Sequence, residues 1–171
     1  MTQRTAFSAA ERSITIGVAC LIAYWIMTGV LNKVVSPDDN LLGGMWAAVA
    51  AAFVFRDAQQ ASLAAGIARL IATFISFALC LVYLVIARPT AIGMALLVGA
   101  GTFILVLLDR RDEIITTAIT TIVVMVVAMV DPADAVKQPL LRMLDTVVGV
   151  AVGVACNAAT AFVFRRRNVG T

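Results

Sequence analysis

The sequence of 171 residues contains no histidine. Histidine is the usual general base near neutral pH, a frequent proton relay and the commonest metal ligand, so its absence argues against a catalytic or metal site. We therefore predict a protein that is not an enzyme and needs no cofactor.

Cysteine and charge are also scarce. The three cysteines, Cys20, Cys80 and Cys156, lie in different apolar runs and have no spacing typical of a metal or redox motif, so we expect them to be buried as packing residues. Only 13% of residues are charged, 13 basic and 10 acidic, and they gather at the ends of apolar runs. This distribution indicates membrane anchoring and argues against nucleic-acid binding.

The sequence is instead rich in long hydrophobic runs. Hydrophobic residues make up 62% of the sequence, against about 45–50% in soluble domains. Six apolar runs approach the roughly 20 residues that a bilayer requires, at about 13–31, 41–55, 67–87, 90–108, 114–130 and 144–164. The run 41–55 is the shortest, so it is tilted, re-entrant or prolonged through Ala58. We predict an all-α integral membrane protein with six transmembrane helices and a single transmembrane domain spanning residues 1–171.

Basic residues indicate the orientation. With a cytoplasmic N-terminus and six spans, nine arginines fall inside and four basic residues outside, which favours both termini in the cytoplasm. The inside set is Arg4, Arg12, Arg56, Arg69, Arg110, Arg111, Arg165, Arg166 and Arg167; the outside set is Lys33, Arg88, Lys137 and Arg142.

A motif occurs twice. Arg69-x-x-x-Thr73 and Arg142-x-x-x-Thr146 are offset by 142 − 69 = 73 residues, and each precedes an apolar run. A duplicated three-helix unit must be inverted relative to its copy, a pattern typical of transporters. We therefore expect two inverted repeats, about 13–87 and 90–164, with interfacial connectors at 57–70 and 131–140 that place both arginines near helix starts.

Small and polar residues follow the same offset. Ser76 and Cys80 align with Gly149 and Gly153, and the fifth helix carries threonines where the second has glycine and alanine. Gly149-x-x-x-Gly153 is typical of close helix packing. The threonines either serve such packing or line a wet path. They are Thr116, Thr117, Thr120 and Thr121.

The arginines offer the sharper hypothesis. A pseudo-symmetric pair, Arg69 and Arg142, would attract anions from both sides of the membrane, whereas an interfacial arginine that snorkels to headgroups needs no substrate. Asp145, three residues after Arg142, either pairs with it or carries a coupling proton. Asn157 lies deep in the sixth run and either bonds a neighbouring helix or takes part in coupling or gating.

Three segments carry a family resemblance: Met45-Trp46-Ala47-Ala48, residues 69–73 and residues 142–150. Together they resemble the fusaric-acid-resistance and aromatic-acid-exporter membrane proteins, which are distantly similar to plant aluminium-activated malate transporters. The resemblance extends over about residues 12–164. It implies two inverted three-helix units, an organic anion as substrate and a dimeric assembly, with Arg69 and Arg142 at the positions of the family's arginines.

These observations predict a transporter or channel of the bacterial inner membrane that exports organic anions, with aromatic anions as one candidate class, as a homodimer or larger homo-oligomer. The expected substrate-binding residues are Arg69, Arg142, Thr73, Thr146, Thr117, Thr120 and Thr121, with Asp145 and Asn157 for coupling or gating. The competing interpretation is a non-transporting subunit or scaffold that binds a larger membrane partner.

Overall fold

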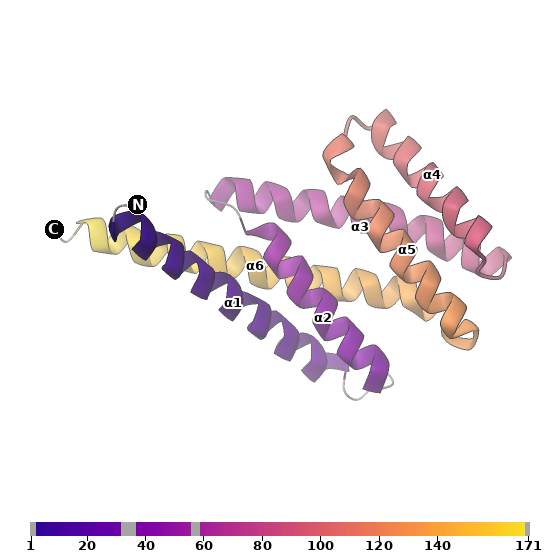
Figure 1. The fold of residues 1–171 in the computed structure, drawn as a ribbon, viewed down its shortest axis with the longest axis horizontal. Helices are drawn as coiled ribbons and strands as arrows, with labels where there is room; N and C mark the ends of the chain where they lie inside the picture. Colours follow the sequence, from indigo (N-terminus) through magenta and orange to yellow (C-terminus); the bar gives the residue numbers. More distant parts are fainter. Residues whose placement is uncertain (1–2, 32–36, 56–58, 170–171) are drawn as a thin grey trace. The chain divides into compact units, whose positions relative to one another are not determined.

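The computed structural model describes residues 3–31, 37–55 and 59–169, and this part of the chain is helical without any strand (Figure 1). The predicted all-α class is confirmed. The helices are α1 (Gln3–Leu31), α2 (Pro37–Val54), α3 (Gln59–Ile86), α4 (Ala91–Leu107), α5 (Ile114–Val130) and α6 (Lys137–Val169), with short 3-10 helices η1 (Arg111–Glu113) and η2 (Pro132–Asp134).

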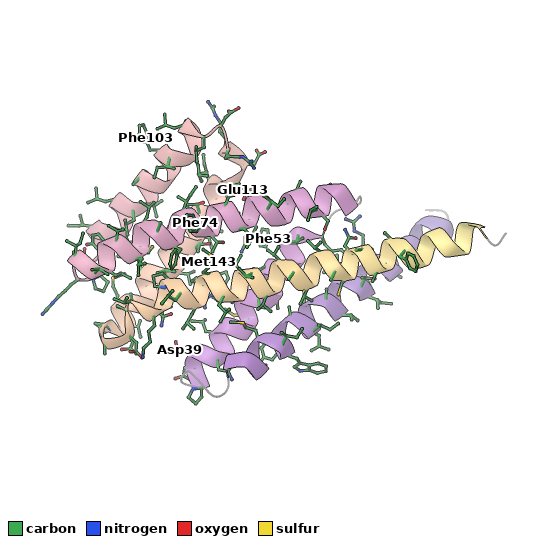
Figure 2. The ribbon with its side chains drawn as sticks, turned by 180° about the vertical axis from the view of Figure 1, so that it is seen from behind. Asp39, Phe53, Phe74, Phe103, Glu113 and Met143 are labelled. Carbon is green, nitrogen blue, oxygen red and sulfur yellow. The ribbon has the colours of Figure 1, made fainter. Side chains whose placement is uncertain are left out.

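Among the residues that the structure describes, four segments are long and apolar enough to cross a bilayer: Arg12–Gly29, Ala61–Ile86, Arg111–Val130 and Lys137–Phe162. The apolar helix α4 has 17 residues, at the lower limit for a span. The first turn of α2 is polar and includes Asp38 and Asp39 (Figure 2), so its apolar part is short. The protein is thus a multi-pass membrane protein, and six spans stay a prediction.

The helix starts differ from the sequence prediction. The expected connectors 57–70 and 131–140 are mostly helical, because α3 begins at Gln59 and α6 at Lys137. The residues after Gln59 are largely alanine, glutamine and leucine, which favour helix. Likewise α2 is extended at its N-terminal end, from Pro37, and ends at Val54. The predicted break at Arg56-Asp57 and the extension through Ala58 lie outside the described residues.

This shift moves the arginines into the helices. Arg69 is 69 − 59 = 10 residues after the start of α3, or about 15 Å along its axis. Arg142 is 142 − 137 = 5 residues into α6. The prediction that both arginines lie near helix starts therefore holds for Arg142 and was wrong for Arg69.

The chain forms two compact units. Unit 1 contains residues 1–67 and 145–171, which include α1, α2 and most of α6; unit 2 contains residues 68–144, which include most of α3, α4 and α5. Each unit therefore combines a helix pair from one predicted repeat with the third helix of the other.

Close packing holds unit 1 together. Gly149 and Gly153 of α6 lie against the backbone of α2 at Ala47 and Ala51, where a Cβ atom on Gly153 would come within 2.8 Å of the Ala51 carbonyl oxygen. A Cβ atom on Gly149 would also lie 2.7 Å from the Cβ of Ala50. The close-packing interpretation of the small-residue motif is confirmed for these two glycines.

Unit 2 has an apolar core that includes Cys80, Leu97 and Met125 from three helices. The predicted burial of Cys80 is confirmed, whereas Cys20 and Cys156, which were also predicted to be buried, are only partly buried. The α3–α4 turn is fixed by Thr90, whose hydroxyl oxygen accepts a hydrogen bond from the Gly93 N–H at 3.0 Å and lies 3.2 Å from the Tyr83 hydroxyl. This N-cap explains why α4 begins at Ala91.

We expect Gly149→Ala to destabilise the protein, because the added methyl group has no space against α2. Overpacking of this kind costs about 1–3 kcal/mol, which a lower midpoint of thermal unfolding in detergent would reveal. The matched control is Gly99→Ala on the exposed face of α4, where nothing lies within 4 Å. It should leave the midpoint unchanged or raise it. Equal effects of the two substitutions would contradict the packing.

Candidate functional site

The predicted arginines are both buried. Arg69 is 7% exposed and Arg142 is 4% exposed. A guanidinium inside a membrane helix carries a large desolvation cost, and residues that bear this cost usually face a protein interior or a water-filled cavity. Such low exposure does not match a side chain that snorkels along a lipid-facing surface.

Polar side chains continue from Arg69 along one face of α3. Thr73 and Ser76 follow at the spacings i+4 and i+7, which place all three residues on the same side of the helix. Thr73 is 1% exposed and Ser76 is fully buried. The polar face of α3, which we define as Arg69, Thr73 and Ser76, therefore lies inside the protein.

Hydrogen bonds join this polar face to α5. The Ser76 hydroxyl donates to the Thr117 carbonyl oxygen at 2.9 Å and lies 3.0 Å from Thr121 Oγ1. Because a serine hydroxyl has one hydrogen, Thr121 must be the donor in the second bond. The Thr117 hydroxyl in turn donates to the Ala72 carbonyl oxygen at 3.3 Å.

The predicted threonines of α5 are thus engaged within unit 2. Thr117 and Thr121 bond α3, and Thr120 donates to the carbonyl oxygen of Thr116 in its own helix at 2.9 Å. All three are buried. This geometry supports the packing interpretation for the hydroxyl groups of Thr117 and Thr121.

Thr73 differs from these threonines. Its hydroxyl is buried and makes no hydrogen bond within the described part of the chain. A buried polar group without a partner costs about 1–3 kcal/mol. It lies one helical turn after Arg69, where an anion or a water molecule could accept its proton.

The corresponding motif in α6 is arranged differently. The Thr146 hydroxyl donates to Asp145 Oδ1 at 3.3 Å, and the two residues are 5% and 1% exposed. Asn157, farther along α6, is 9% exposed. The motif that ends at Thr146 therefore includes a buried acid that the motif in α3 lacks.

Two buried polar residues escaped the sequence prediction. Gln138 is 2% exposed and precedes Arg142 by four residues, on the same face of α6. Ser62 is fully buried and donates to the Val54 carbonyl oxygen at 2.5 Å. Both were assigned to connectors, and the i, i+4 spacing to Arg142 was the available signal for Gln138.

Together, the apolar spans and the polar residues buried between helices define a class: a multi-pass helical membrane protein with cations in its interior. Among the described residues no cluster of potential metal ligands occurs. The family model for fusaric acid resistance protein-like sequences matches residues 19–156, most of the chain. The protein belongs to this family, as its motifs suggested, and the family's role is in membrane transport and efflux. No curated protein and no solved structure gives a significant match.

We expect the Ser76–Thr121 hydrogen bond to stabilise the α3–α5 contact. Ser76→Ala and Thr121→Val should each destabilise, and their double variant should cost less than the sum, with a coupling near 0.6 kcal/mol, the average for membrane proteins. Reversible unfolding in detergent measures the cycle. Thr120→Val is the control, because its hydroxyl bonds only its own helix. Strict additivity of Ser76→Ala and Thr121→Val would contradict the assignment.

Proposed function

We propose that the protein is a transporter or channel for organic anions in the bacterial inner membrane, with both termini in the cytoplasm. The observation that carries the proposal is the burial of two guanidinium groups, Arg69 and Arg142, inside helices of a membrane protein. Arginine side chains that stay charged inside a membrane protein favour an anionic substrate.

The α3 motif has the chemistry for a carboxylate. An arginine can donate two parallel hydrogen bonds to the two oxygens of a carboxylate. The unsatisfied hydroxyl of Thr73, one turn farther along the same face, can donate a further bond. We assign Arg69 and Thr73 as the primary contacts, and Arg142 and Thr146 as the second pair.

The second pair, Arg142 and Thr146, has a buried acid, Asp145, between its two members in the sequence. Asp145 is buried and receives the hydroxyl hydrogen of Thr146. A carboxylate beside an anion path lowers anion affinity unless it is protonated, so Asp145 is the candidate for proton coupling or gating. Asn157 shares this role as a buried amide in the same helix.

The α5 threonines have a supporting role. The bonds of Thr117 and Thr121 to α3 hold the polar face in register, so they position Arg69 and Thr73 rather than contact the anion themselves. Thr120 remains a candidate lining residue, since its hydroxyl oxygen can accept a bond in addition to the one it donates.

Corresponding contacts support the repeat. Ser76 and Gly149 are equivalent by the 73-residue offset, and each lies at a contact between a third helix and the middle helix of the other repeat: Ser76 against α5, Gly149 against α2. We propose two inverted three-helix repeats with six spans in total. Six short helices enclose a pore poorly, so we also propose a homodimer, in which the second copy would complete the walls of the pore.

We predict that Arg69→Gln and Arg142→Gln each reduce organic-anion flux at least tenfold, because each removes a buried cation that offsets the cost of dehydrating the anion. The measurement is the uptake of labelled benzoate and malate by liposomes containing the purified protein. Arg110→Gln, an exposed arginine of the α4–α5 loop, is the control and should retain the flux.

Unchanged flux and selectivity in both variants would overturn the proposal. Absence of any flux from the wild type, with tight co-purification of a larger membrane protein, would favour the scaffold interpretation. A pH gradient across the same liposomes separates the two transport mechanisms: it drives accumulation in a proton-coupled carrier, and this drive should disappear in Asp145→Asn, whereas a channel responds to membrane potential alone.

A further inference from the structure

Within unit 2, α3 and α4 border an apolar groove with a volume of about 560 Å³. Seven residues of α3 from Phe74 to Ile86, together with Ala87 directly after it, form most of its wall, and Leu97 and Ile104 of α4 complete it. Phe74, which is labelled in Figure 2, is the first residue of α3 in the wall. The groove lies off the polar face of α3, since its wall contains Phe74 and Ile75 but neither Thr73 nor Ser76.

The length and the wall of the groove suit a hydrocarbon chain. Phe74 and Ala87 are 13 residues apart, which corresponds to about 20 Å along a helix. No polar atom faces the groove, although Tyr83 belongs to its wall, because the Tyr83 hydroxyl lies 3.2 Å from Thr90 Oγ1. An extended acyl chain can therefore follow the groove over this length without leaving a polar group of the wall unsatisfied.

A basic residue lies directly after the last groove residue of this segment in the sequence. Arg88, directly after Ala87, is exposed and has neither an ion pair nor a hydrogen bond with any residue of the described ranges. The α5–α6 connection lies at the same end of unit 2, where Lys137 pairs with Asp134 at 2.6 Å and Asp131 is exposed. Lys137 and Asp134 largely cancel each other, and Arg88 is the exposed basic residue next to the groove, with Asp131 as the exposed acid of the α5–α6 connection.

We propose that this groove is a binding site for an anionic phospholipid, with one acyl chain between α3 and α4 and the phosphate headgroup at Arg88. The apolar wall offers the chain hydrocarbon contact over about 20 Å, about two-thirds of the thickness of a bilayer core. The groove wall provides no hydrogen-bond partner for a carboxylate, which separates this site from the proposed anion path at Arg69.

The test is native mass spectrometry of the full chain released from nanodiscs that contain equal amounts of phosphatidylglycerol and phosphatidylcholine. The wild type should retain phosphatidylglycerol about fivefold more than phosphatidylcholine, the preference expected for one basic residue near the headgroup. Arg88→Gln should lower the retained phosphatidylglycerol to the level of phosphatidylcholine. Arg110→Gln, at an exposed arginine beyond the opposite end of α4 from Arg88, should keep the preference.

A second variant tests the acyl chain. Ala78→Phe places a ring in the groove and should reduce retention of both lipids several-fold, while Arg88→Gln leaves phosphatidylcholine unchanged. Equal retention of both lipids by the wild type, or an unchanged preference in Arg88→Gln, would overturn the proposal. Displacement of the bound lipid by millimolar benzoate would also overturn it, because the groove would then be a substrate site. Loss of lipid retention with normal anion flux would leave the proposed transport function intact.

Discussion

The constraint on which the structure depends is the cost of burying a guanidinium group in a membrane. Estimates for an arginine at the bilayer centre range from about 3 to more than 10 kcal/mol, so Arg69 and Arg142 must be surrounded by protein groups or by water. The polar face of α3 provides polar protein groups on one side of Arg69. The Ser76 and Thr117 hydrogen bonds keep α5 against that face, and they thereby keep lipid away from it.

The two units solve helix packing in different ways. In unit 1, Gly149 and Gly153 allow α6 to approach the backbone of α2, so this contact has no space for water. In unit 2, hydroxyl groups join α3 and α5 at the equivalent place. Hydroxyl contacts can exchange a protein partner for water at little cost, whereas glycine contacts cannot. The polar contact is therefore the one compatible with a wet path.

The sequence was sufficient for the helical class, the family and the presence of long apolar helices, because hydropathy and the repeated motif are local signals. The starts of α3 and α6 were not predicted correctly. Residues 59–68 include Gln59, Gln60 and Ser62 and were therefore assigned to a connector. Alanine and glutamine form helix readily, and the segment from Ala61 is apolar enough to belong to a span. Gln138 was missed for the same reason. The bonding of Thr117 and Thr121 to α3, and the unsatisfied hydroxyl of Thr73, depend on tertiary contacts between residues about 45 positions apart.

Accessibility of Thr73 to a water-soluble anion tests the central claim most directly. In a protein without Cys20, Cys80 and Cys156, Thr73→Cys should react in intact membranes with a negatively charged thiosulfonate reagent. The reaction should slow when malate or benzoate is present and when Arg69 is replaced by glutamine. If Thr73→Cys stays unmodified while Asp112→Cys in the exposed α4–α5 loop reacts, the polar face of α3 is dry, and the account of an anion path beside Arg69 is contradicted.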